Sequence, residues 1–167
     1  VVTDQPLSKN FSFLADYDPL LNDYALRAEL TAYSDPNTSL IKSRQLGELL
    51  AKSTAAHAGM DCTEGTFDAT IGLLRRQKLI PNDVNSHFDL IRLYGNEANH
   101  EHLRDAKAAL RSLIVAHSVA IWFQANVRDD SSFSALPFKP PPKPTDATAE
   151  LENEILFLRD EAARMQL

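Results

Sequence analysis

The chain has 167 residues, with 17 lysine and arginine residues against 23 aspartate and glutamate residues, and a formal net charge of −6 at pH 7. This acidic balance excludes a domain that clamps DNA over its whole surface, because phosphate binding needs a local excess of cations. Hydrophobic residues make up 44% of the chain and charged residues 24%, which excludes a disordered chain and favours a globular domain.

The composition also bounds the cellular setting. The single cysteine, Cys62, cannot form an internal disulfide and fits a reducing cytoplasm, so we expect a cytoplasmic protein without a metal site. No apolar run approaches the ~20 residues of a membrane-spanning helix, and we expect no membrane association. Because the chain opens at Val1 without a signal peptide and stops at Leu167 inside a helical pattern, we expect a segment of a longer protein.

Apolar residues recur in threes and fours along most of the chain, without strand-like alternation. This periodicity predicts an all-α bundle of about five helices over residues 11–128, preceded by a loose arm over residues 1–10. A short helical turn is predicted at 11–15. The longer predicted helices cover 19–33, 38–57, 66–79, from 81 to about 102, and 103–126.

Local signals mark the starts of the early helices. Asp18 precedes Pro19, an arrangement that caps a helix and places proline in its first turn. Pro36 disfavours helix at the residue before it, and Asp35 or Asn37 can cap the helix that follows. Later in the chain, His117 falls on an apolar helix face, where we interpret it as a core histidine.

The stretch FDLIRLYGNEANHEH, residues 88–102, is the one we consider central to the domain. Arg92, Asn96 and His100 recur at intervals of four, so a helix places them along one polar stripe. Gly95 costs a helix interior about 1 kcal/mol relative to alanine, which indicates a close contact with a neighbouring helix. The three polar residues are also the candidate catalytic residues, although a packing role through hydrogen bonds is the alternative.

A second polar pair, Arg44 and Glu48, stands four residues apart on the helix predicted over 38–57. One interpretation is a surface ion pair of about 0.3–0.5 kcal/mol. The other is a half-buried pair that faces the row of Arg92, Asn96 and His100. Together these five side chains are the candidate structural or interaction residues of the domain.

The character of the sequence changes after the bundle. Residues 129–145 include PFKPPPKP and predict a stiff, extended linker. Residues 146–167 predict a helix in which apolar residues step by four, three, four and three, as in the core positions of a coiled coil. We therefore expect the start of a coiled-coil-like helix and a homodimer formed through it. The seam consists of Leu151, Ile155, Leu158, Ala162 and Met165.

Three separated stretches, FSFLADYDPLL, SDPNTSLIKSRQLGELLAK and FDLIRLYGNEANHE, resemble the N-terminal domain of type I restriction enzyme R subunits. The resemblance runs from about residue 11 to 123 and ends in AIWF. The same module also resembles the HEPN-type helical domains. In the HEPN active site an arginine precedes a histidine at a shorter spacing, whereas here seven residues separate Arg92 from His100 and nine separate Arg92 from His102.

The resemblance implies a division of labour within a larger enzyme for restriction of foreign DNA. The parent R subunit would be a site-specific deoxyribonuclease and ATP-driven DNA translocase, with ATP and Mg²⁺ bound outside this segment. The segment itself would be an accessory, non-catalytic module without a cofactor. Its implied partners are other subunits of the restriction complex or downstream domains of the same chain, with DNA reached through the parent enzyme.

Two further functions stay open at this point. One is a HEPN-like ribonuclease that acts as a dimer through Arg92, Asn96 and His100. The other is a self-associating structural domain that dimerises through residues 146–167.

Overall fold

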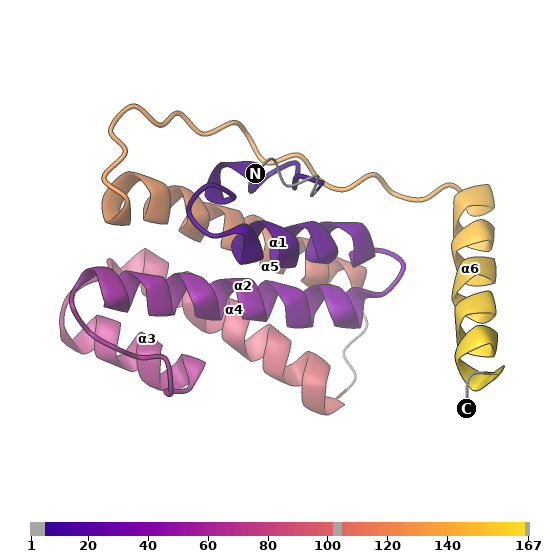
Figure 1. Ribbon diagram of the computed structural model, residues 1–167, viewed down its shortest axis with the longest axis horizontal. Helices are drawn as coiled ribbons and strands as arrows, with labels where there is room; N and C mark the ends of the chain where they lie inside the picture. Colours follow the sequence, from indigo (N-terminus) through magenta and orange to yellow (C-terminus); the bar gives the residue numbers. More distant parts are fainter. Residues whose placement is uncertain (1–5, 102–104, 166–167) are drawn as a thin grey trace.

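The computed structural model describes residues 6–101 and 105–165 and contains helices, with no strand, over those residues (Figure 1). The predicted all-α bundle with a C-terminal helix is confirmed. The start of the arm, His102 and the last two residues of the C-terminal helix pattern lie outside the described residues. In chain order the elements are η1 (Ser12–Leu14), α1 (Pro19–Thr31), α2 (Pro36–His57), α3 (Phe67–Arg76), α4 (Asn82–Glu101), α5 (Ala106–Trp122), the π-helical η2 (Phe123–Val127) and α6 (Asp146–Met165).

Side-chain caps set the first residues of α1 and α2. The Asp18 carboxylate accepts a hydrogen bond from the second helical N–H at 3.0 Å, and the Asp35 carboxylate accepts one from the third helical N–H at 3.2 Å. Each aspartate is followed by a proline, whose missing N–H costs nothing in the first turn. Since Asp35 is the cap rather than Asn37, α2 begins at Pro36, two residues before the predicted start.

The ends of three helices depart from the predicted ranges, and the first of these, α1, ends at Thr31 rather than near residue 33. α3 ends at Arg76 rather than at Leu79, because Lys78 adopts a left-handed conformation with φ of 54° and the Leu79 N–H bonds back to the Leu74 carbonyl at 2.9 Å. α5 continues into η2, where the backbone widens to a π-helix. The two elements together cover residues 106–126 of the helix predicted over 103–126, and Asp105 is the N-cap.

α2 lies at the centre of the bundle and packs against α1, α3, α4 and α5. Four fully buried phenylalanines fill the space between these helices, and Phe67 meets Phe88 edge to face with ring centroids 6.0 Å apart. The other two are Phe11 and Phe123. The core therefore joins η1 to every helix of the bundle, while α6 stands apart from it (Figure 1).

The segment Ala106–Val127 corrects one expectation from the sequence. Its mean hydropathy of 1.3 over a window of membrane-spanning length would allow a span on length and composition, although no such run was expected. In the fold, 56% of that window is buried inside the bundle. This burial is the pattern of a core helix, because α5 packs against both α2 and α4.

The described end of the predicted loose arm, residues 6–10, is held firmly against α1. The Ser8 N–H donates to Asn22 Oδ1 at 2.8 Å, and the side chains of Ser8 and Asn10 are both buried. The arm was predicted to be loose. It is ordered at these residues because Ser8 and Asn10 form hydrogen bonds with side chains of α1, which the arm sequence alone does not indicate. The arm is a packed edge of the bundle at these residues.

The proline-rich segment leaves η2 and runs back across the N-terminal residues toward α6, as an extended chain (Figure 1). We call residues 133–144 the strap. Phe133 packs on Phe13 with ring centroids 4.7 Å apart, and Phe138 packs on His117 at 5.5 Å. The segment is thus extended as predicted, but its phenylalanines dock it on the bundle instead of leaving it as a free linker.

Candidate functional site

The crossing of α2 and α4 is built on two glycines. A Cβ atom at Gly95 would lie 2.5 Å from Arg44 Cβ, and one at Gly47 would lie 3.0 Å from Ile91 Cγ2. Real Cβ atoms do not approach other carbons to 2.5 Å, so only glycine fits at position 95. The predicted close contact at Gly95 is confirmed, and its partner is the Arg44 side chain.

Arg44 connects the two helices through polar contacts as well. Its Nε donates to Asn96 Oδ1 at 3.0 Å, and its Nη1 donates to Glu48 Oε2 at 3.2 Å. Lys52 extends the row along α2, with its Nζ 3.1 Å from Glu48 Oε1. The side chains of Arg44 and Glu48 are 30% and 24% exposed. The pair is therefore half-buried, as one of the two interpretations predicted, and the residue of the predicted polar row that it contacts is Asn96.

Arg92 is turned toward α3 and not toward Asn96. Its Nε lies 3.5 Å from Asp68 Oδ1, and its Nη2 lies 3.5 Å from Asp89 Oδ1. The Arg92 side chain is 19% exposed and Asp68 is 75% exposed, so this group forms a partly solvated ion cluster between α3 and α4. Arg92 and Asn96 therefore serve two different helix contacts.

His100 lies exposed near the end of α4. It is eight residues beyond Arg92, which corresponds to about 12 Å along a helix axis. An acid–base residue and a cation that act on one phosphodiester must both lie within hydrogen-bonding reach of it. Within one copy of the chain, the structure brings Arg44, Glu48 and Asn96 together and leaves His100 apart from them.

A buried polar cluster on α1 was not predicted from the sequence. Glu29 is 8% exposed and accepts hydrogen bonds from the Ser8 hydroxyl and from Asn10 Nδ2, the latter at 3.1 Å. Burial raises the pKa of the Glu29 carboxyl above its ordinary value, although these donors favour the charged form. The usable signal was the position of Glu29, which follows Ala25 and Ala28 on the apolar side of its helix.

Asn10 links this cluster to the strap. Its Oδ1 accepts from the Lys139 N–H at 2.7 Å, and its Nδ2 donates to the Lys139 carbonyl at 2.9 Å. One side-chain amide thus satisfies both backbone groups of a residue in the strap, as a neighbouring strand would. We call this pair of hydrogen bonds the clasp.

His117 lies 6% exposed between Phe11 and Phe138, with ring centroids 5.6 and 5.5 Å away. The prediction that it belongs to the core is confirmed. Burial lowers the pKa of the His117 imidazole, which favours the neutral ring at physiological pH. His117 therefore supports the docked strap through ring packing.

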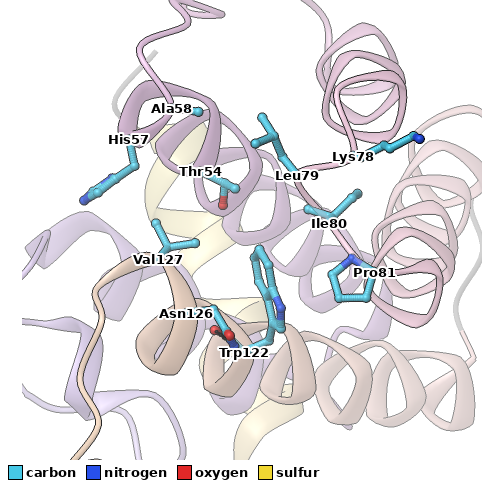
Figure 2. A pocket seen from close by; sticks show the side chains of 10 residues that line it. All are labelled: Thr54, His57, Ala58, Lys78, Leu79, Ile80, Pro81, Trp122, Asn126 and Val127. Carbon is cyan, nitrogen blue, oxygen red and sulfur yellow. Dashed lines mark hydrogen bonds between the residues drawn. The ribbon is translucent and has the colours of Figure 1, made fainter.

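A cavity of about 600 Å³ opens where α2, α3 and η2 end (Figure 2). Figure 2 shows the Trp122 indole between Val127 on one side and Ile80 and Pro81 on the other. The cavity lining contains no acidic side chain. Its residues are Thr54, His57, Ala58, Lys78, Leu79, Ile80, Pro81, Trp122, Asn126 and Val127.

Two polar side chains at this cavity already form hydrogen bonds within their own helices. Asn126 Nδ2 donates to the Trp122 carbonyl at 3.0 Å, and His57 Nδ1 lies 3.1 Å from the Ser53 carbonyl. Both bonds go to backbone carbonyls one turn earlier in the same helical segment. What remains is an open concave surface with an aromatic centre, a shape suited to a side chain of another protein segment.

Comparisons with known proteins identify a family and a curated relative for this chain. The family described as "Domain of unknown function (DUF4145)" matches residues 27–122. The chain is 31% identical over 124 residues to the type I restriction enzyme EcoKI endonuclease subunit of Escherichia coli strain K12. That alignment covers 74% of this chain and 10% of the relative, so the chain spans about a tenth of that protein's length.

No solved structure matches the chain significantly. The resemblance to type I restriction R subunits, predicted from three sequence stretches, is confirmed by the curated relative. The likeness to HEPN domains is not tested by these comparisons and stays a hypothesis.

Proposed function

Because the chain belongs to the DUF4145 family and shares 31% identity with a type I restriction endonuclease subunit, we propose that it is a non-catalytic contact module of such an enzyme. The supporting observation is the extent of the match, which covers most of this chain but only 10% of the relative. A module of this size would hold parts of the enzyme together in the cytoplasm. Its partners would be other subunits of the complex or other domains of its own polypeptide, and through them DNA.

The geometry of the polar row supports a structural role. Arg44 donates hydrogen bonds to Asn96 and Glu48, and Arg92 lies 3.5 Å from Asp68 and from Asp89. Arginines that contact side chains on a neighbouring helix help to fix the angle between the two helices. The sequence also carries no glycine-rich phosphate-binding loop, so ATP and Mg²⁺ would act in other parts of the parent enzyme.

The contact surface that we assign to this function is the cavity around Trp122. Interfaces draw much of their binding energy from a few buried aromatic and apolar anchors, and tryptophan is enriched among them. An apolar side chain of a partner would enter the cavity and pack against the Trp122 indole, Val127 and Ile80. The surface needs no rearrangement of the bundle to accept it.

Binding measurements with the remaining subunits of the restriction enzyme, and with the rest of the same polypeptide, test the proposal. We expect wild-type binding, and a loss of at least about tenfold in affinity, or ~1.4 kcal/mol, for Ala58→Arg, which places a long side chain over the cavity. Ala56→Arg is the matched control, because Ala56 is also exposed near the end of α2 but does not line the cavity.

Two results would contradict these assignments. Absence of wild-type binding to every subunit and domain of the enzyme would overturn the contact function itself. Equal binding by both arginine variants would keep the contact function but remove the cavity as its surface. Circular dichroism of both variants verifies that the helical bundle is intact.

A further inference from the structure

α6 presents an unusual amount of apolar surface to solvent. Its exposed fractions are 57% for Leu151, 43% for Ile155, 54% for Leu158 and 78% for Met165. Figure 1 shows α6 standing away from the bundle at the end of the strap. Within the described residues, nothing covers this seam, which makes it a surface for another polypeptide.

We propose that α6 pairs with α6 of a second copy of this chain, as a parallel, in-register, two-stranded coiled coil. The seam repeats over two heptads, with Ile155 and Ala162 at a positions and Leu151, Leu158 and Met165 at d positions. Such a seam needs a partner with the same spacing, and a second copy supplies it by symmetry. The pairing uses only α6, so it is independent of the cavity around Trp122.

The residue types in the seam determine how many helices pair and in which direction. A β-branched residue at a and leucine at d favour two parallel helices over trimers or tetramers. Ile155 occupies the central a position, and Leu151 and Leu158 are the d positions on either side of it. In this register each leucine packs against its own symmetry mate.

The charges beside the seam also favour the parallel direction. Glu154 lies at a g position and Arg159 at the following e position, so a parallel pair forms two Glu154–Arg159 contacts between the helices. An antiparallel pair would instead oppose Glu154 to Glu161. This repulsion would offset the attraction between Glu152 and Arg159 in the same arrangement.

Other side chains of α6 lie outside the seam. Arg164 pairs with Asp160 within the helix, at the outer c and f positions. Leu156 and Phe157 fall at b and c, and Phe157 is 65% exposed. Phe157 therefore offers a matched apolar control that the proposed pairing does not bury.

Cysteine cross-linking in the full chain tests direction and register together. In a Cys62→Ala background, Leu151→Cys places one thiol at a d position, where parallel in-register helices bring two copies within disulfide reach. In a glutathione redox buffer we expect most Leu151→Cys protein to run as a covalent dimer, and Phe157→Cys to remain mostly monomeric. An antiparallel pair would place residue 151 near residue 162 of the other helix and leave Leu151→Cys uncross-linked.

A charge exchange provides the second measurement. Arg159→Glu should shift sedimentation-equilibrium masses toward the monomer, and the double variant Glu154→Arg with Arg159→Glu should restore the dimer. Monomeric wild type at all concentrations, equal cross-linking at 151 and 157, or no rescue by the double variant would each overturn the proposal. Circular dichroism confirms that α6 stays helical in each variant.

Discussion

Gly95 of α4 lies directly against the side chain of Arg44 on α2, so close that a Cβ atom would meet Arg44 Cβ at 2.5 Å and Cδ at 2.6 Å. The same arginine then reaches past the glycine to Asn96. Close approach and hydrogen bonding therefore depend on each other at this helix crossing.

Gly95→Ala is expected to destabilise the bundle, because the helix gain of up to about 1 kcal/mol is outweighed by overpacking of about 1–3 kcal/mol. Urea unfolding followed by circular dichroism measures the change. Gly72→Ala is the control, since its new Cβ would meet only the end of the flexible Arg76 side chain, at 3.1 Å. We expect that variant to be neutral or slightly more stable, and equal effects of the two substitutions would contradict the steric explanation.

The buried Glu29 carboxyl should make stability depend on pH in a defined direction. Because its folded-state pKa is raised by burial, the folded protein holds this proton more tightly than the unfolded chain does. Its contribution to the free energy of unfolding is therefore complete below the ordinary carboxyl pKa and is lost as pH rises through the folded-state pKa.

Glu29→Gln removes this titration and isolates it from the other carboxyls. We expect the free energy of unfolding of the variant, minus that of the wild type, to increase as pH rises from about 4 to 7. Urea unfolding across this range gives both values. A difference that falls with rising pH would show that the carboxylate is stabilised in the folded state, contrary to the effect of burial.

Asn10→Ala should release the strap from the bundle. The substitution removes both hydrogen bonds of the clasp and the bond to Glu29, each worth about 0.5–1.5 kcal/mol or more for a charged partner. Hydrogen exchange at Lys139 and proteolysis within residues 133–144 should both accelerate, while the helices keep their protection. Asn99→Ala, at an exposed position of α4, is the control and should change neither rate.

The arrangement of Arg92 and His100 predicts no ribonuclease activity that depends on His100. The two residues lie about 12 Å apart along α4, and Arg92 lies 3.5 Å from Asp68 and from Asp89. Incubation of labelled RNA with the wild type and with His100→Ala should give the same background. Cleavage by the wild type that His100→Ala abolishes would establish the ribonuclease hypothesis and require two copies to combine their α4 helices.

Much of the fold was predictable because its signals are local. Asp18 and Asp35 next to prolines set helix starts, and the spacing of apolar residues identified every helix that the structure describes. The boundary of α3 was missed because its end depends on the backbone of Lys78, a residue with no preference for φ of 54°. Likewise, a polar arm sequence does not disclose that Asn22 and Glu29 will bind it.

The contacts of the candidate site could be predicted even less well from the sequence. Arg92, Asn96 and His100 do share one helix, as their spacing predicts, but spacing on one helix says nothing of the partners on the others. Asn96 meets Arg44 of α2, whereas Arg92 meets Asp68 of α3. Asn96 and Arg92 therefore contact different helices because of the way α2, α3 and α4 pack together.

The sequence by itself determined that this protein is helical, where its helices lie, and that one glycine marks a close crossing, because capping and periodicity act between neighbours in the chain. Only the tertiary structure decided which side chains meet. The arm, α1 and the strap join through Asn10 and Glu29, and the cavity around Trp122 forms where three helices end. These contacts link residues far apart in the chain, and their energies depend on burial that no local pattern records.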